Sequence, residues 1–189
     1  MRSPISGKSS ETAARIAGIL GAIAYKCSEG GDLFAFATDC QKIDISREAP
    51  LIDITNITVN LSNSLGGGTD LNKALRLVEH HSDKTGTKYD NLLVLTDMDC
   101  YGYGMGGSRH KYADAQVDDL LKKGVFRKIW VNNLMGNNFS IVNTNQYTKN
   151  LVTGFSEKFL EVLNTYNELG RGANIKKVID EMLEKKRRA

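Results

Sequence analysis

Residues 65–99 read LGGGTDLNKALRLVEHHSDKTGTKYDNLLVLTDMD, and this stretch decides the fold. After the glycines, apolar residues recur at the helical spacing i, i+3, i+4, i+7, which predicts a helix with a buried face at Leu71, Ala74, Leu75 and Val78. The helix leads to an apolar strand at residues 91–96 that ends at Asp97. Because open α/β sheets bind ligands at the carboxyl ends of their strands, we expect Thr69 and Asp97 to converge at one edge.

The rest of the chain alternates apolar strand patterns with helical patterns, which predicts an α/β fold with a mostly parallel sheet and helices on both faces. Residues 1–8 read as a loop, and Ser9 or Ser10 is the expected cap of the first helix. Further strands are predicted at residues 32–38, 41–45, 126–131 and 139–142. Further helices are predicted within residues 50–62, in the segment that follows residue 109 and ends at residue 123, and at residues 156–169. A last helix with a basic tail is predicted at residues 171–189.

Composition indicates an ordinary globular protein and excludes several classes. The 189 residues fit a single domain, with 41% hydrophobic residues, 25% charged residues and a net charge of +3. Three cysteines without Cys-x-x-Cys spacing favour reduced thiols and a cytoplasmic location. No apolar run reaches the roughly 20 residues of a membrane helix, and no signal peptide is recognisable, so we expect no membrane contact.

Gly67-Gly68-Thr69-Asp70 and Thr96-Asp97 resemble two of the three loops of the metal-ion-dependent adhesion site in von Willebrand factor A domains. The order of these loops, and the Asp99-Cys100-Tyr101 segment after them, look closest to the C-terminal A domain of Ro ribonucleoprotein (TROVE) proteins. The resemblance implies a three-layer, Rossmann-like sheet and a non-enzymatic protein-interaction domain.

The same resemblance implies a site and partners. Thr69 and Asp97 would hold Mg²⁺ or another divalent cation, directly or through water. Gly67, Gly68, Asp70 and Asp99 would form the surrounding partner-binding rim, where a partner protein supplies an acidic group. In Ro proteins a separate helical-repeat ring binds small structured RNA, and residues 1–189 contain no such region.

The sequence departs from the family at its first loop, because no Asp-x-Ser-x-Ser occurs before Gly66. The strand that precedes this loop in the family is central in the sheet. Without it, the strands at residues 32–38 and 91–96 must pair directly, leave a gap, or receive a strand from another chain. We therefore expect residues 1–189 to be a single A-like domain from a larger protein, and a metal to bind only when the missing segment is supplied.

Two other functions remain open from the sequence. Gly7-Lys8-Ser9 is half of a phosphate-binding loop, which would suit a nucleotide-binding enzyme, but the first glycine and the preceding strand are missing. A metal-free structural A domain is the second alternative. Histidines 80 and 81 read as surface residues, and Cys100 has no basic neighbour to activate it, so we expect no enzyme.

Overall fold

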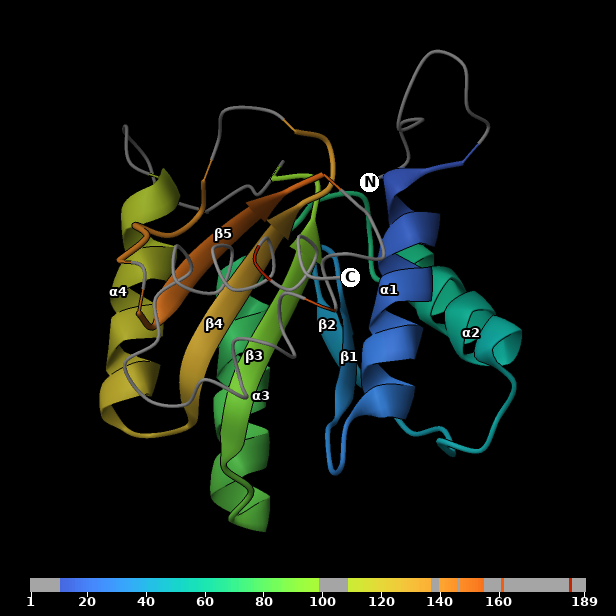
Figure 1. Cartoon of the computed structure of the whole chain (residues 1–189), viewed down its shortest axis with the longest axis horizontal. Helices are drawn as coiled ribbons and strands as arrows, with labels where there is room; N and C mark the ends of the chain where they lie inside the picture. Colours follow the sequence, from blue (N-terminus) through green and yellow to red (C-terminus); the bar gives the residue numbers. More distant parts are fainter. Residues whose placement is uncertain are drawn as a thin grey trace.

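The structure is a computed structural model that describes residues 11–98, 109–136, 140–145, 147–154, 161 and 184. Helices and strands alternate along this part of the chain (Figure 1). Their order is α1 (Ala13–Cys27), β1 (Leu33–Phe36), β2 (Cys40–Ile43), α2 (Leu51–Ser64), α3 (Leu71–Thr85), β3 (Tyr89–Thr96), α4 (Arg109–Lys122), β4 (Phe126–Asn133) and β5 (Lys149–Thr153).

The described strands form two sheets. Strands β3, β4 and β5 are parallel neighbours in that order, with Leu93 opposite Trp130 and Trp130 opposite Asn150. Strands β1 and β2 form an antiparallel pair, with Leu33 opposite Ile43. The predicted α/β class with a parallel sheet is therefore confirmed.

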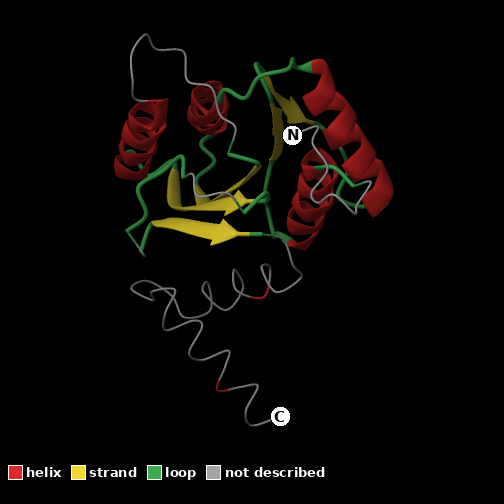
Figure 2. Cartoon of the chain, turned by 90° about the horizontal axis from the view of Figure 1, so that it is seen from above, coloured by secondary structure: helices red, strands yellow, loops and turns green. Residues whose placement is uncertain are grey.

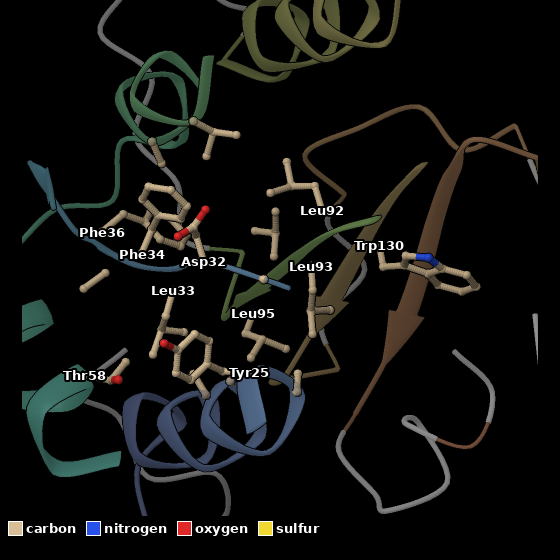
Figure 3. Close-up of a pocket in the computed structure, with 18 of the residues that line it drawn as sticks. Tyr25, Asp32, Leu33, Phe34, Phe36, Thr58, Leu92, Leu93, Leu95 and Trp130 are labelled. Carbon is tan, nitrogen blue, oxygen red and sulfur yellow. The ribbon is translucent and has the colours of Figure 1, made fainter. Parts of the chain in front are cut away.

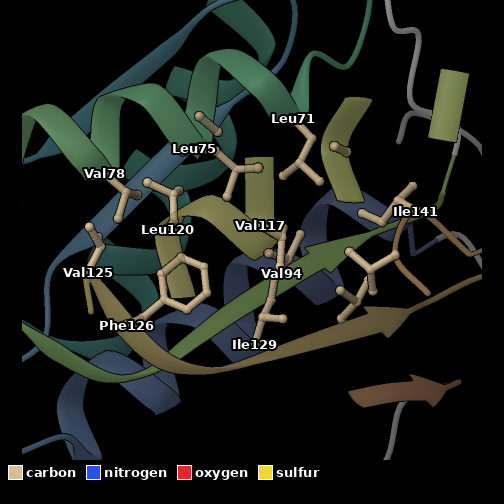
Figure 4. Packing of buried hydrophobic residues seen from close by; sticks show 14 of the residues in the cluster. Leu71, Leu75, Val78, Val94, Val117, Leu120, Val125, Phe126, Ile129 and Ile141 are labelled. Atoms are coloured by element: carbon tan, nitrogen blue, oxygen red, sulfur yellow. The ribbon is translucent and has the colours of Figure 1, made fainter. Parts of the chain in front are cut away.

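Helices cover both faces of the sheets, as predicted (Figure 2). Side chains of a strand alternate between its two faces, so neighbouring residues of β3 belong to different layers. Val94 packs with α3 and α4 in the main core, whereas Leu95 packs against α1 in a smaller cluster. The main core contains the predicted helix residues Leu71 and Leu75, together with Phe126, Val117, Leu120 and Ile129 (Figure 4).

The last described strand lies at residues 149–153, and the predicted strand at 139–142 is wrong. The hydroxyl of Ser140 donates to the carbonyl oxygen of Val142 and accepts from its backbone N–H, which makes a tight turn. Ile141 and Val142 are still buried, at 2% and 3% exposure, so these two apolar side chains pack in the core although they lie in a loop. Residue 139 lies outside the described residues.

Side-chain hydrogen bonds set the caps of two helices, and the first of these caps differs from the sequence prediction. Helix α1 is capped by Thr12, whose hydroxyl accepts from the backbone N–H of Arg15 at 3.2 Å, and not by Ser9 or Ser10. Helix α3 is capped by Asp70, whose carboxylate accepts from Lys73, so Thr69 lies just outside the helix. The helix predicted within residues 50–62 is present as α2, which begins after Pro50.

Strands β1 and β3 do not pair with each other. Among the described residues, β1 pairs with β2 alone, and β3 pairs with β4 alone. Of the three arrangements that the sequence left open for these strands, direct pairing is therefore excluded, and among the described residues a gap separates them. Within β3, Val94 is buried, whereas Leu92, Leu93 and Leu95 are only half-buried.

No helix in the described part of the chain is both long enough and apolar enough to cross a lipid bilayer. The predictions for residues 156–169 and 171–189 concern segments outside the described residues, apart from Glu161 and Glu184.

Candidate functional site

The loop at residues 66–70 is fastened to the turn between β1 and β2. The backbone N–H of Asp70 donates to the carbonyl of Ala37 at 2.7 Å, and the N–H of Gly68 donates to the hydroxyl of Thr38 at 2.8 Å. Gly66 has a φ of +109°, a conformation that side chains with a Cβ rarely adopt. The glycine-rich loop is thus shaped by its contact with Thr38, and Thr69 sits at its end, half-buried.

Asp97 follows the last residue of β3 directly and is 9% exposed. The chain turns sharply there, since Met98 has a φ of 63° and donates its backbone N–H to the hydroxyl of Thr96 at 3.2 Å. The carbonyl of Thr96 accepts from the N–H of Leu134, which follows β4, at 2.9 Å. Asp97 is therefore held at the carboxyl end of the parallel sheet by the loops that follow two neighbouring strands.

Hydrogen bonds show that β1 and β3 run in the same direction on either side of the gap. Asp32, just before β1, accepts a 2.7 Å hydrogen bond from the hydroxyl of Tyr89, the first residue of β3. The amino ends of both strands are thus joined, and both carboxyl ends lie on the opposite side. Thr69, in the loop fastened beyond the end of β1, and Asp97, directly after β3, therefore lie on that same side of the molecule.

The described residues offer an incomplete set of ligands for Mg²⁺, which takes six oxygen ligands in octahedral geometry. The Thr69 hydroxyl and the Asp97 carboxylate are two candidate donors, but the carboxylate of Asp70 already caps α3. The described part of the chain contains no group of three or more histidine, cysteine, aspartate or glutamate side chains that could hold a metal. These residues alone therefore do not fit a resident Mg²⁺.

Several predicted site residues lie outside the described residues. They are Asp99 of the predicted rim and the candidate phosphate loop at residues 7–9. Cys100 and the basic tail, which were not predicted as sites, also lie outside the described residues. Gly67 and Gly68 are described; Gly67 is exposed, with open space around the position of an added Cβ.

A cavity of about 290 Å³ lies between β1 and β3 (Figure 3). Phe34 and Phe36 line it from β1, and Leu92 and Leu93 line it from β3. Helix α1 closes one face and helix α3 closes the other, through Ala17, Gly21, Leu75 and Val78. We call this space, bounded by the facing edges of β1 and β3 and by α1 and α3, the slot.

A polar cluster closes the amino end of the slot, and sequence reasoning missed it. Asp32 accepts from Tyr89, lies 3.1 Å from Nε2 of His81, and forms an ion pair with Lys42 at 3.0 Å. Burial raises the pKa of Asp32, but the hydrogen bonds from Tyr89 and Lys42 and the positive charges nearby outweigh it, so the pKa is lowered. Burial and the bond to Asp32 raise the pKa of Tyr89.

His81 belongs to this cluster and is not the plain surface residue that the sequence suggested. Its side chain is 17% exposed and makes an edge-to-face contact with the ring of Phe34 at 5.9 Å between centroids. The sequence signal available was weak: an aspartate ahead of a strand, and a histidine ten residues after Leu71 on the apolar stripe of α3. Both ends of the contact are far apart in the sequence, so no local pattern links them.

A second buried ion cluster fixes β5. The ammonium group of Lys149, 8% exposed, lies 2.9 Å from carboxylate oxygens of both Asp114 and Asp118 on α4. Burial lowers the pKa of Lys149, but its bonds to Asp118 and Asp114 outweigh this and raise it. Asp114 also accepts two hydrogen bonds from Asn143, so this cluster joins α4, a loop and β5. Its partners are all satisfied, which indicates a structural role.

Comparison with solved structures gives a match at the level of the fold. No family model matches the sequence, and no curated protein sequence matches it. Among solved structures, the chain is similar to the Ro (RSR) protein of Deinococcus radiodurans, with a TM-score of 0.56 and 16% sequence identity. The match covers 82% of this chain and 29% of that protein, so this chain spans less than a third of its length. At this identity the likeness establishes the fold: the chain has a Rossmann-like α/β fold that is also present in a Ro protein.

Proposed function

We propose that this chain is a non-enzymatic interaction domain of a Ro-like protein, which binds a partner protein at the carboxyl side of its sheet. The binding surface is the rim, which comprises the loop at residues 66–70 and Asp97. The observation that carries the proposal is the arrangement of these two polar segments beside the ends of two strands that run in the same direction. In open α/β sheets this is where ligands bind.

The likeness to the Deinococcus Ro protein supports the proposal at the level of the fold. In the complete protein we propose that small structured RNA is bound by another domain. The rim of this chain would then contact a protein partner through an acidic group of that partner.

In this proposal, a divalent cation would be coordinated jointly by this chain and by another segment or the partner. Thr69 and Asp97 supply a hydroxyl and a carboxylate, and the remaining oxygen ligands would come from another segment or from the partner. We therefore expect the chain alone to bind Mg²⁺ weakly, with a Kd above about 1 mM. Titration calorimetry with Mg²⁺ measures this for the wild type and for Asp97→Asn. Tight binding that survives Asp97→Asn would place the cation elsewhere and contradict the rim as a metal site.

Partner binding is tested with a photo-crosslinking amino acid at Gly67, where an added side chain meets open space. The matched control carries the same amino acid at Lys88, which is exposed and directly precedes β3 at the opposite end of the sheet. In extracts of the source cells, we expect one discrete protein to crosslink from position 67 and not from position 88. Equal crosslinking from both positions, or none from position 67, would refute the proposed surface.

The same measurements separate the alternatives. Heat on adding ATP that is abolished by Lys8→Ala would favour a nucleotide-binding enzyme. Thermal stability that is unchanged by Mg²⁺ and by Asp97→Ala, together with no crosslinked partner, would favour a purely structural A domain.

A further inference from the structure

Two asparagine side chains, Asn132 on β4 and Asn150 on β5, are buried with their polar atoms unpaired. They are 0% and 2% exposed, and in the described part of the chain neither Oδ1 nor Nδ2 of either side chain has a hydrogen-bond partner. A carboxamide carries two N–H donors and an acceptor oxygen, and folded proteins satisfy almost all such groups when they are buried. The two unpaired carboxamides therefore point to a bound molecule that supplies their hydrogen bonds.

The register of the sheet places the two carboxamides on the same face. Trp130 lies opposite Asn150, and Asn132 lies opposite Val152. Side chains of a strand alternate between its faces, so these four residues share a face, and the two asparagines occupy one diagonal of the square that they form. Asn132 also lies opposite Leu95 of β3, which packs against α1. The carboxamides therefore lie on the face of the sheet that α1 covers at β3.

The distance between the two asparagines suits a small bridging molecule. Neighbouring strands lie about 4.8 Å apart and two residues advance about 6.6 Å along a strand, so the two Cα atoms are about 8 Å apart. Asn132 and Asn150 do not hydrogen-bond to each other. A molecule that forms two hydrogen bonds of about 2.8 Å joins polar atoms that are about 5.5 Å apart. One or two molecules of this size therefore join carboxamides that lean toward each other along the diagonal.

The surroundings select water as this molecule. The ligand must donate and accept hydrogen bonds at once, since each carboxamide presents both kinds of group. It must be uncharged, because a buried ion needs a counter-charge, and Lys149 is already paired with Asp114 and Asp118 on the other face of the sheet. The indole N–H of Trp130 is also engaged, since it donates to Asn91 at 3.1 Å. Buried water meets these requirements, because it typically bonds to polar groups that have no other partner.

We propose that Asn132 and Asn150 form an internal water site, in which one or two water molecules bridge the two carboxamides. The bridge joins β4 to β5 through side chains, in addition to the pairing of their backbones. It also accounts for two polar side chains at fully buried positions of a sheet. The site does not rest on the proposed function of the rim.

The first test measures water contacts in the full chain by NMR, through Overhauser effects between water and side-chain NH2 protons. The pH is mildly acidic, so that the NH2 protons exchange slowly with solvent. We expect the NH2 groups of Asn132 and Asn150 to show cross-peaks with the sign that long-lived water gives. The matched control is Asn63 on α2, an exposed residue whose NH2 group should contact only rapidly exchanging water.

A double-substitution cycle tests whether the two carboxamides share the water. Leucine has nearly the shape of asparagine but no polar side-chain atom, so Asn132→Leu or Asn150→Leu alone leaves the other carboxamide with fewer partners. Each single substitution is expected to lower the ratio of folded to unfolded protein about tenfold. The double substitution removes both polar groups and is expected to lie within about threefold of the wild type. Urea denaturation measures these ratios.

The control pair for the cycle is Asn132→Leu with Asn63→Leu, for which the two effects should multiply because the residues lie on separate elements. The NMR measurement on the wild type decides the proposal even where a variant fails to fold.

Three results would overturn the proposal. They are the absence of long-lived water at both NH2 groups, a single leucine substitution that raises the folded fraction, and effects of the two leucine substitutions that multiply as in the control pair. None of these results bears on crosslinking from the rim, so the two proposals fail separately.

Discussion

The two sides of β3 differ sharply although residues 92–95, in the second half of the strand, are uniformly aliphatic. On one side it pairs with β4, whose residues Ile129, Trp130 and Val131 are 0% exposed. On the other side it borders the slot, and its own Leu92, Leu93 and Leu95 are only half-buried. The comparison teaches that an apolar run allows a strand to be buried, but the number of neighbouring strands determines how deeply its side chains are buried.

The largest expected effect compares one truncation on each side. Ile129→Ala removes a fully buried side chain from the main core and should lower the free energy of unfolding by about 3 kcal/mol. Leu93→Ala removes a side chain that lines the slot and should cost about 1 kcal/mol or less. Urea denaturation measures both. Equal losses would show that the slot side is as well packed as the β4 side.

The next largest loss of stability is expected from the ion cluster at β5, which lies on the β4 side of β3. Lys149→Met leaves Asp114, whose side chain is 14% exposed, without its cation and should cost about 2 kcal/mol. The control is Arg127→Met, because the exposed pair of Arg127 and Asp90 should contribute less than about 0.5 kcal/mol. Adding Asp114→Asn to Lys149→Met should recover part of the loss. If Lys149→Met and the control lowered the free energy of unfolding by similar amounts, the Lys149 cluster would not have the structural role assigned to it.

A smaller loss of stability is expected from a change in the backbone conformation of the loop at residues 66–70, which belongs to the rim. In Gly66→Ala the new Cβ would lie 2.8 Å from Thr38 at a φ of +109°, so we expect a loss of about 1–2 kcal/mol. Gly67→Ala, where nothing lies within 4 Å, should change stability by less than about 0.5 kcal/mol. Thermal unfolding distinguishes them. If neither substitution lowered thermal stability, the loop would not be held against the β1–β2 turn.

The smallest effect concerns the cluster that joins β1 to β3. Tyr89→Phe removes one hydrogen bond to Asp32 and should cost about 1 kcal/mol at neutral pH. Because the pKa of Asp32 is lowered below 3.8, the unfolded chain binds more protons near that pH. The stabilisation from this carboxylate is therefore present above 3.8 and is lost as pH falls through the lower, folded pKa.

The pH dependence provides the control for that variant. Unfolding free energies measured by urea between neutral pH and about pH 2.5 should fall less steeply below pH 4 in Tyr89→Phe than in the wild type, because the variant holds the charged Asp32 less strongly. Parallel curves would mean that Tyr89 does not influence this titration, and that the amino ends of β1 and β3 are held by other contacts.

Much of the fold could be predicted from local periodicity. Leu71 and Leu75 lie on the buried face of α3, and the strands at β3 and β4 are parallel, as their aliphatic runs indicated. Strand β5 was missed because Lys149 and Asn150 open it, and polar residues rarely signal a buried strand. Their burial depends on α4 and β4, which no local pattern reveals.

The candidate site was predictable only in its outline. Thr69 and Asp97 follow strand and loop signals, so their placement on one side of the molecule could be anticipated, but their role as metal ligands stays a prediction. The gap beside β3 was one of three arrangements left open, since sequence periodicity does not specify which strands are neighbours. The cluster of Asp32, His81 and Tyr89 arises from tertiary contacts alone.

The edge of β3 at the slot, which pairs with no described strand, also affects how the isolated chain should behave in concentrated solution. An uncovered aliphatic strand is a template for strands from partly unfolded neighbours, and this is how ordered aggregates begin. With a net charge of +3, electrostatic repulsion between copies is weak. We therefore expect open strand edges such as this one to limit how long the purified protein stays free of aggregates.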